Sequence, residues 1–314
     1  MYSHPVVNSF HDFQAIIVGG APLSPEVHEF LRTTLGINLA QGYGLTETVG
    51  GVTLSTAEDL SVGRVGQPLP GVRVKLRDWE EGGYVVLNTT GHGPRGEILV
   101  GGPMITSGYY NLPEKSAEVL YIDPSDGLRW FRTGDIGQLD PNDGVLKIID
   151  RKKDLVKLQM GEYVSLSKVE TWLKTHDFVE SICVVAEPTK SYCVALMVPD
   201  SEKLNRFAAQ SLDICLSSFT DVCLHPDVIA LVTQQLQDYA KAHLEKFEIP
   251  RRLALLSEPW TPETGLVTAA LKLRRKIIHK KFRWLINELY NDDKYPSDEH
   301  NCLTEPPTPK VKNA

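Results

Sequence analysis

Residues 41–47 (QGYGLTE) combine the residue types that hold a phosphorylated ligand. The glycines Gly42 and Gly44 let a ligand approach the backbone closely. Thr46 offers a hydroxyl group to a phosphate, and Glu47 offers a carboxylate to Mg²⁺. A glycine-rich loop followed by a helix-capping threonine explains the segment equally well when it is taken alone.

Two further segments carry charged side chains that could contact a nucleotide. In the segment RTGD (residues 132–135), Asp135 could accept two charge-assisted hydrogen bonds from a ribose diol, although a β-turn aspartate is the simpler interpretation. The charged run DRKKD (residues 150–154) suits a solvated hinge between two domains. An arginine in this run, Arg151, could also clamp a nucleotide.

Lys272 follows the segment GLVTAAL and precedes a basic stretch that we predict to be helical. A compact ammonium group on a flexible stem could neutralise a phosphate. A lysine in a basic helix is more often one of several solvated charges. The charges that follow here are Arg274, Arg275, Lys276, Lys280 and Lys281.

Two motif matches carry little weight. Residues 91–96 (GHGPRG) fit the dinucleotide pattern G-x-G-x-x-G, which requires a helix directly after it. The β-rich run EILV follows instead, and Pro94 interrupts the motif, so a turn between strands is the better interpretation. Residues 88–90 (NTT) match a glycosylation sequon, but no export signal accompanies them.

The phosphate-binding candidates follow a strand–helix–strand pattern. Residues 13–18 (FQAIIV) read as a short buried strand that enters a tight GGAP turn. Ser24 is a plausible N-cap for a helix over residues 26–35, and a second strand begins at Leu39. This spacing predicts a βαβ fragment of a parallel sheet, and open α/β sheets bind ligands at the carboxyl ends of their strands.

The pattern of apolar runs and turn residues changes twice after this fragment. From residue 63 to 149, the short apolar runs VRVKL, YVVL, EILV, WFRTGDIGQL and VLKII alternate with turn residues, which predicts an antiparallel sheet or a small barrel. After residue 150 we expect a hairpin, a helix from Ser167, two strands, and helices at about 201–209, 227–243 and 269–290. The segment 291–314, proline-rich and poor in apolar residues, is expected to be a disordered tail.

The composition is that of an ordinary globular protein long enough for about two domains, with 42% hydrophobic and 23% charged residues. The net charge of -7 argues against a nucleic-acid partner, although the basic stretch after Lys272 raises that possibility. The five cysteines contain no CxxC pair, which suggests a reducing compartment and no zinc site. No run of 18 apolar residues or signal peptide is present.

Taken in order, six segments resemble the core motifs of the adenylate-forming (AMP-binding) superfamily, which includes acyl-CoA synthetases, luciferases and peptide-synthetase adenylation domains. They are GGAPLS, QGYGLTET, RGEILVGG, RTGDIG, DRKKD and the final lysine, Lys272. The segments WEEGGY, VKLQMGEYVSLSKVE, EKFEIP and SEPWTPETGLVTAALKLRRK are similar to long-chain fatty-acid CoA ligases of the animal 3/4 type and their plant relatives. The resemblance covers roughly residues 13–290.

The resemblance implies roles for individual residues. The implied ATP or AMP site consists of Gly20, Ala21, Pro22, Gln41, Gly42, Tyr43, Gly44, Thr46, Asp135 and Arg151. Within it, residues 20–22 would lie against adenine with Tyr43 stacked on it, and Asp135 would bind the ribose hydroxyls with help from Arg151. Thr46 would touch phosphate and Glu47 would hold Mg²⁺.

The resemblance also implies a reaction in which the second domain moves. Thr46, Glu47 and Lys272 would be catalytic, with Lys272 bridging the acyl carboxylate and the α-phosphate. Lys153 would be the hinge, and Gly161, Glu162 and Tyr163 would line the route of coenzyme A. The expected activity converts a fatty acid, ATP and CoA into acyl-CoA, AMP and pyrophosphate.

The implied fold is α/β followed by α+β. Residues 1–150 would be the carboxy-terminal part of the AMP-binding domain, with the βαβ fragment and a small β-barrel, and residues 151–290 the mobile domain. The family's phosphate loop is not found upstream of GGAPLS, so we expect a truncated ligase that is inactive alone. The alternative is an inactive remnant that binds nucleotide or regulates a partner.

The resemblance bears on location as well. Family members work on the cytosolic side of endoplasmic reticulum, mitochondrial outer or peroxisomal membranes. Their membrane association would come from the missing amino-terminal part, because no anchor is found in this sequence.

Overall fold

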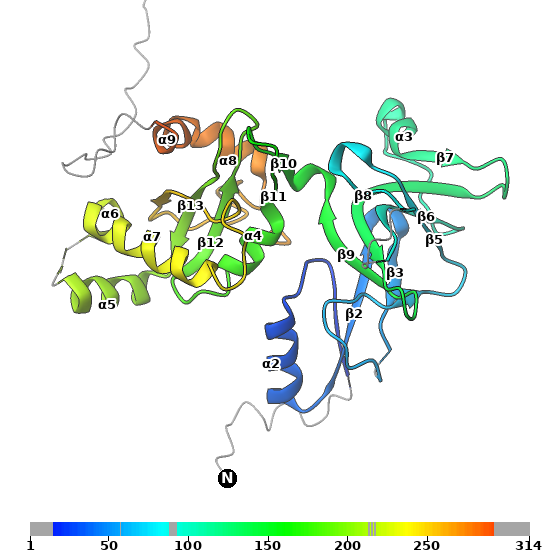
Figure 1. Ribbon diagram of the computed structural model, residues 1–314, viewed down its shortest axis with the longest axis horizontal. Coiled ribbons are helices and arrows are strands. Elements are labelled where there is room, and N and C mark those ends of the chain that lie inside the picture. Colours follow the sequence, from blue (N-terminus) through cyan, green and yellow to red (C-terminus); the bar gives the residue numbers. More distant parts are fainter. Residues whose placement is uncertain are drawn as a thin grey trace, which may run out of the picture. The chain divides into compact units, whose positions relative to one another are not determined.

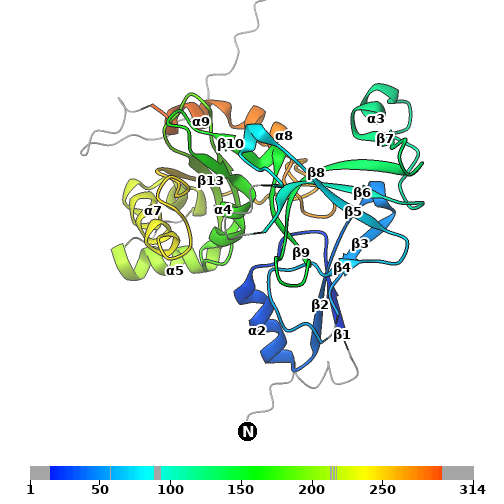
Figure 2. The same cartoon turned by 45° about the vertical axis from the view of Figure 1, so that its right-hand side comes forward.

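The computed structural model describes residues 15–56, 58–87, 93–212, 214, 216 and 218–291. The chain divides into two compact units, the first ending at Lys153 and the second beginning at Asp154 (Figures 1 and 2). The predicted sequon, the first two residues of the GHGPRG match, Cys215, Cys302 and the tail from residue 292 lie outside the described residues.

The first unit begins with the predicted strand–helix–strand fragment, although its first strand is not buried as expected, since Ile17 is 69% exposed. Strand β1 (Ala15–Val18) pairs in parallel with β2 (Asn38–Leu45), and helix α2 (Pro25–Leu35) connects them. The Ser24 hydroxyl accepts a hydrogen bond from the Val27 amide at 3.3 Å, so Ser24 caps the helix as the sequence predicts. Gly36, with a φ of 63°, ends it in the left-handed conformation that glycine adopts without strain.

The QGYGL segment belongs to a strand, where its glycines suggested a loop. Strand β2 continues past its parallel partner, and residues 42–45 pair with the antiparallel strand β3 (Gly50–Leu54). A short fourth strand, β4 (Gln67–Pro68), completes the sheet in the order β1-β2-β3-β4. Strands β3 and β4 were not predicted, because both are short and rich in glycine or proline.

The rest of the first unit is an antiparallel sheet. Its strands are β5 (Arg73–Arg77), β6 (Arg95–Gly101), β7 (Leu120–Ile122), β8 (Arg129–Leu139) and β9 (Leu146–Arg151). The order is β5-β6-β8-β7, with β9 paired to the second half of β8. Buried Ile98, Val100, Phe131 and Leu146 form part of its core, and helix α3 (Pro113–Val119) precedes β7.

Two details of this region differ from the prediction. A small barrel was one expectation, but within the described strands β5 pairs only with β6, so the sheet stays open. The run YVVL is not a strand. Tyr84 forms only an isolated bridge with Trp79 across the short 3₁₀ helix η2 (Glu80–Gly82), which turns the chain too tightly for a longer ladder.

The second unit is a three-stranded sheet with a helical layer on each face. The sheet has the order β12 (Val179–Val185), β13 (Val194–Pro199) and β14 (Leu253–Leu255). Successive side chains along each strand point to opposite faces of the sheet, so each face has its own hydrophobic core. Ile182 and Met197 pack with α4, α5, α6 and α7, whereas Cys183 and Leu196 pack with α8 and α9. Figure 1 shows the helices of this unit around the sheet.

The helices of this unit follow the sequence prediction except near Lys272 and at the short helix α6, which was not predicted. They are α4 (Leu166–Leu173), α5 (Ser201–Leu212), α6 (Phe219–Leu224), α7 (Pro226–Ala240), α8 (Arg275–Lys281) and α9 (Arg283–Leu289). The predicted helix over 269–290 therefore begins six residues late and is broken at Phe282. Leu271 has a φ of 56°, which is incompatible with a right-handed helix.

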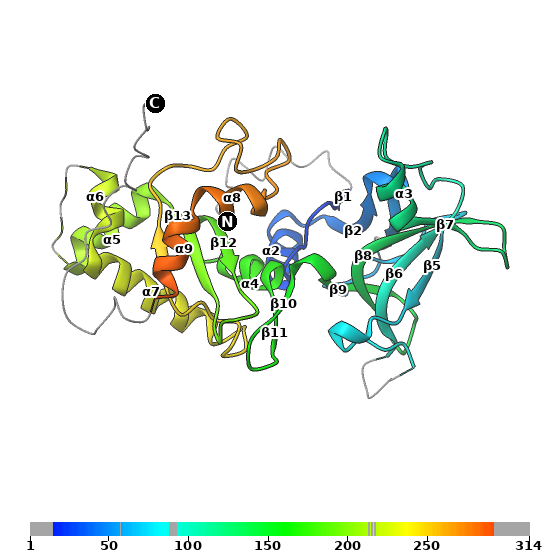
Figure 3. The same cartoon turned by 90° about the horizontal axis from the view of Figure 1, so that it is seen from above.

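The expected hairpin after the unit boundary is present. Strands β10 (Leu155–Lys157) and β11 (Tyr163–Ser165) pair antiparallel, and Figure 3 shows them from above. The Ser165 hydroxyl accepts from the Lys168 amide and begins α4. None of the helices in the described segments is both long and apolar enough to cross a bilayer.

The core of the second unit gives a stability prediction. The Met197 side chain is fully buried on β13, whereas Met160 in the hairpin turn is 73% exposed. Met197→Ala should lower the free energy of unfolding by about 2–5 kcal/mol, because it removes buried contacts and leaves a cavity. Met160→Ala should change it by less than about 0.5 kcal/mol. Urea unfolding followed by circular dichroism measures both, and equal losses would contradict the core assignment.

Candidate functional site

The GGAP turn lies against the strand that carries the QGYG motif. A β-carbon added at Gly19 would stand 3.1 Å from the carbonyl oxygen of Gly42, and Gly20 turns the chain with a φ of 84°. Gly20, Ala21 and Pro22 are all exposed after β1. The turn and the motif thus share one edge of the sheet, and the turn's residues are accessible to a ligand.

Strand packing accounts for part of the glycine pattern. A β-carbon at Gly44 would lie 1.7 Å from the carbonyl oxygen of Gly50, so only glycine fits where β2 meets the turn into β3. Gln41 is buried, and its amide donates to the Ser55 hydroxyl at 2.8 Å. The Gln41 side-chain oxygen has no hydrogen-bond partner among the described residues. Gln41 and Gly44 therefore have structural roles whether or not a ligand binds.

The most organised polar group of the first unit is centred on Asp135. The Tyr43 hydroxyl donates to Asp135 Oδ2 at 2.7 Å, and Arg151 Nε donates to Oδ1 at 2.6 Å. The Asp135 amide donates to the Thr133 hydroxyl, which in turn donates to the Ile98 carbonyl oxygen. Tyr43 and Arg151, which lie 92 and 16 positions from Asp135 in the sequence, thus both bind its carboxylate.

Burial and a neighbouring charge keep the Tyr43 hydroxyl protonated. Asp135 is only 2% exposed, while the Arg151 side chain is half exposed. Burial, with the Asp135 carboxylate next, raises the pKa of the Tyr43 hydroxyl far above its ordinary value. Tyr43 therefore stays a hydrogen-bond donor at every physiological pH and fixes one oxygen of Asp135.

Glu47 lies in the short 3₁₀ helix η1 (Thr46–Thr48), and both its side chain and its backbone accept hydrogen bonds. Its carboxylate accepts from the Tyr109 hydroxyl at 2.6 Å, and its carbonyl oxygen accepts from the Thr106 amide at 2.9 Å. Burial, followed by the hydrogen bond to Glu47, raises the pKa of Tyr109 to about 12. The neighbouring Thr46 side chain is exposed.

The surroundings of Glu47 fit one type of metal site. Within the described segments no three His, Cys, Asp or Glu side chains gather as a metal cluster. A single carboxylate cannot enclose a cation, but it suits Mg²⁺, which commonly keeps its waters and takes substrate phosphates as ligands. Glu47 would then be the protein's contribution to a metal held mainly by a nucleotide.

The predicted hinge lies between anchored neighbours. Lys152 donates to the buried Glu97 carboxylate at 3.0 Å, and Arg151 is bound to Asp135. Lys153 itself is exposed and makes no ion pair with any described residue. The boundary between the two units follows it directly.

Lys272 lies in the second unit, in a hydrogen-bonded turn rather than a helix. The Thr268 amide donates to the Lys272 carbonyl oxygen at 2.8 Å, and the Lys272 amide donates to the Thr268 hydroxyl at 3.1 Å. Val267 and Leu273 form a β-bridge that closes the turn. The Lys272 side chain is exposed, which suits both interpretations made from the sequence.

Arg275 is not one of the solvated charges with which the sequence grouped it. It forms a two-pronged ion pair with Glu170, whose side chain is 8% exposed, and both N–O distances are 2.7 Å. No local pattern indicates a partner 105 residues away. Tyr109 was missed in the same way, because the GYY segment has no chemical signature of its own.

The candidate coenzyme A residues form the tip of the β10–β11 hairpin. Gly161 has a φ of 101°, and the Leu158 amide donates to the Glu162 carbonyl oxygen at 2.8 Å. The Lys157 ammonium group lies 5.4 Å from the centre of the Tyr163 ring. The hairpin therefore presents a cation and an aromatic ring side by side.

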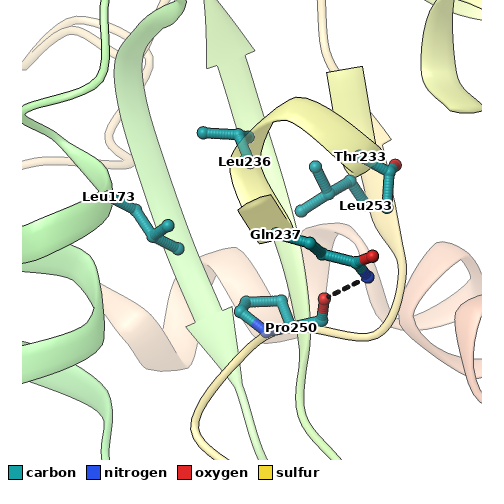
Figure 4. Close-up of a pocket in the computed structure, with 6 residues that line it drawn as sticks. All are labelled: Leu173, Thr233, Leu236, Gln237, Pro250 and Leu253. Carbon is teal, nitrogen blue, oxygen red and sulfur yellow. Dashed lines mark hydrogen bonds between the residues drawn. The ribbon is translucent and has the colours of Figure 1, made fainter. Parts of the chain in front are cut away.

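A hollow elsewhere in the second unit is no candidate site. It lies between α7 and β14 and is lined by Leu173, Thr233, Leu236, Gln237, Pro250 and Leu253 (Figure 4). The Gln237 side-chain amide donates to the Pro250 carbonyl oxygen at 3.0 Å, and the space is too small for a water molecule.

Comparison with known proteins gives this arrangement a family. Residues 4–110 match the family model described as AMP-binding enzyme. The chain belongs to the AMP-binding enzyme family. It is 51% identical over 276 residues to Long chain acyl-CoA synthetase 8 of Arabidopsis thaliana, covering 88% of this chain and 38% of that protein. Long-chain-fatty-acid–CoA ligase 1 of Schizosaccharomyces pombe is 39% identical, covering 87% and 39%.

Solved structures of AMP-binding enzymes have the same fold. The adenylation domain of a carboxylate reductase from Mycobacterium chelonae superimposes with a TM-score of 0.71 and 34% identity, covering 87% of this chain and 38% of that chain. The A domain of carboxylic acid reductase from Segniliparus rugosus, in complex with AMP and a co-purified carboxylic acid, gives 0.71 and 30%, with the same coverage. The chain thus spans about two fifths of the length of the relatives it matches.

The Tyr109–Glu47 contact predicts a pH effect. Because folding raises the Tyr109 pKa from 10.0 to about 12, the contact stabilises the folded chain fully below pH 10.0 and is lost as the pH rises through about 12. In ¹³C-tyrosine NMR spectra, the Tyr109 ring signal is assigned with Tyr109→Phe. At about pH 10.5 this signal should still be that of a protonated hydroxyl. In Glu47→Gln it should ionise at lower pH.

Tyr110→Phe is the matched control for this experiment. Tyr110 is next in the sequence and 91% exposed, so its removal should leave the Tyr109 titration unchanged. A Tyr109 signal that titrates identically with and without the Glu47 carboxylate would contradict the contact.

Proposed function

We propose that this chain forms part of a long-chain fatty acid–CoA ligase, in which it contacts the adenosine part of ATP and supplies the domain that carries Lys272. The observation that carries the proposal is the buried Asp135 carboxylate, held between the Tyr43 hydroxyl and Arg151. The names of the synthetase relatives and the AMP bound to the Segniliparus rugosus A domain support it.

The proposed nucleotide contacts follow from this geometry. Each Asp135 oxygen has a lone pair left after its bond to Tyr43 or Arg151, so the carboxylate can accept from both ribose hydroxyls. Because Tyr43 and Arg151 already orient it, binding requires little rearrangement. The exposed GGAP turn, beside the same edge of the sheet, would contact adenine, and Tyr43 would contribute its ring.

The proposed reaction has two steps. The fatty acid carboxylate attacks the α-phosphorus of ATP and expels pyrophosphate, which gives an acyl-adenylate. The thiol of CoA, having lost its proton, then attacks the acyl carbon and expels AMP. The protein's contribution to the first step is positioning and neutralisation of charge, with Thr46 at a phosphate oxygen.

Glu47 would hold Mg²⁺ on the phosphates, and the cation would supply positive charge there. Tyr109 orients the Glu47 carboxylate through its hydroxyl. Lys272 would neutralise charge at the α-phosphate during adenylation. Rotation at Lys153 would then replace it by the hairpin at residues 161–163, which would line the CoA route.

The ribose contact is testable by substitution. Asp135→Ala should reduce kcat/KM for ATP at least about tenfold, because it removes two charge-assisted hydrogen bonds worth about 1.5–3 kcal/mol each. The enzyme is a chimera in which residues 1–314 replace the matching segment of the Arabidopsis synthetase. Asp143→Ala, a surface carboxylate of the same unit, is the control and should change little.

The outcomes separate the proposal from its alternative. A chimera that binds AMP through Asp135, measured by calorimetry, but makes no acyl-CoA would favour a nucleotide-binding or regulatory role. Loss of AMP binding in Asp135→Ala with an unchanged folding transition supports the site. An effect below about tenfold would remove Asp135 from the ribose assignment.

Lys272 is tested by half-reaction. Lys272→Ala should slow adenylation, followed by pyrophosphate exchange, by about 10²–10³, because it removes a charge donor at the reacting phosphate. Thioester formation from pre-made acyl-adenylate and CoA should survive. Lys276→Ala, an exposed lysine four residues on, should affect neither step. Equal losses in both half-reactions would indicate a folding defect instead.

A further inference from the structure

One ion-pair cluster in the second unit is unused by the proposed reaction. It joins Asp154, the first residue of the unit, to the first residue of α8, Arg275, and to Glu170 on α4. Arg275 Nε lies 3.3 Å from Asp154 Oδ1, and its two terminal nitrogens lie 2.7 Å from the two Glu170 oxygens. The guanidinium group thus binds two carboxylates from segments far apart in the sequence.

The cluster is built for rigidity. Glu170 is 6% exposed and also accepts from the Val184 amide at 2.8 Å, and Arg275 donates to the Val184 carbonyl oxygen. Asp154 also accepts a hydrogen bond from the Ser167 hydroxyl. Burial alone would lower the pKa of Arg275, but the Glu170 carboxylate raises it above its usual value. The guanidinium group is therefore permanently charged and is oriented by contacts with three other segments of the chain, at Asp154, on α4 and on β12.

The same residue is close to Lys272 along the chain. Only two residues separate Lys272 from Arg275, and the Arg274 amide donates to the Leu266 carbonyl oxygen at 2.9 Å. At the tip of the turn, Leu271 is 68% exposed with a φ of 56°, a conformation that costs free energy and persists only where the surrounding structure imposes it. The residues on which such a turn is built must therefore be held in place by the rest of the unit.

We propose that Arg275 is a positioning residue that fixes the Lys272 turn to the segment beginning at Asp154. Motion at the hinge then carries the turn as part of one rigid body, and Lys272 arrives at the phosphate in one orientation. The proposal rests on the proposed function for the role of Lys272, but the ordering of the turn by Arg275 can be measured without any activity.

The first measurement is hydrogen exchange on the 314-residue chain. Arg275→Lys keeps the charge but loses the two-pronged geometry, so exchange of the bonded amides of Leu271, Lys272 and Arg274 should rise about tenfold. The amides of β13 should keep their rates. Lys168→Arg is the matched control. Lys168 lies on α4, the helix that carries Glu170, and it also pairs with a buried carboxylate, that of Glu248.

A second variant guards against unfolding. Arg275→Lys risks leaving Glu170 poorly paired. Asp154→Asn removes only the ion pair between Arg275 and Asp154 and leaves the Arg275–Glu170 pair intact. It should raise exchange of the turn amides by about threefold or more. Exchange that rises equally in β13, or turn rates unchanged in both variants, would overturn the proposal.

The second measurement links the turn to catalysis in the chimera. Arg275→Lys should slow pyrophosphate exchange about tenfold and leave thioester formation from acyl-adenylate within about twofold, because a misplaced donor affects only the step that uses it. Equal losses in both steps would mean a merely structural role and overturn the proposal. If Lys272→Ala spares adenylation while Arg275→Lys still loosens the turn, the role proposed for Lys272 fails and the ordering of the turn stands.

Discussion

The need to pair buried carboxylates organises both units. Among the described residues, four acidic side chains are buried, and each has a cationic partner, because an unpaired buried charge is costly. The pairs are Glu97 with Arg77 and Lys152, Asp135 with Arg151, Glu170 with Arg275, and Glu248 with Lys168. Three of these clusters include a residue from the segment 151–154. Side chains on each side of Lys153 are therefore tied to their own unit, as the hinge proposed at that residue requires.

The same constraint prepares the candidate ribose site. A buried aspartate that waited for a ligand would carry an unpaired charge, but Asp135 is already satisfied by Tyr43 and Arg151. These partners leave half of its accepting capacity unused and fix the direction of the rest. Stability of the free chain and the proposed recognition of a diol would thus use the same carboxylate without conflict.

The sequence could predict what short-range patterns determine. Strand alternation, the Ser24 cap and the order of the family motifs led to the βαβ fragment, the second-unit sheet and the fold class. The Lys272 region was predicted wrongly, because helix propensity in 269–274 is overridden by hydrogen bonds between Thr268 and Lys272 and by the positive φ of Leu271. The partners of Glu47 and Glu170 could not be predicted, since Tyr109 and Arg275 lie 62 and 105 residues away.

An ordered turn at Lys272 has a consequence for how a moving domain delivers a charge. If the turn were flexible, bringing the ammonium group to a phosphate would require fixing several backbone torsions as well as the side chain, at about 1–2 kcal/mol for each residue. The bonds to Thr268 fix that backbone in advance, so only the side-chain torsions of Lys272 remain to be ordered. In the proposed reaction, rotation at Lys153 and an ordered turn at Lys272 would therefore be complementary. A rigid domain turning about a short hinge can place a distant lysine reproducibly only if the lysine's own segment does not move independently.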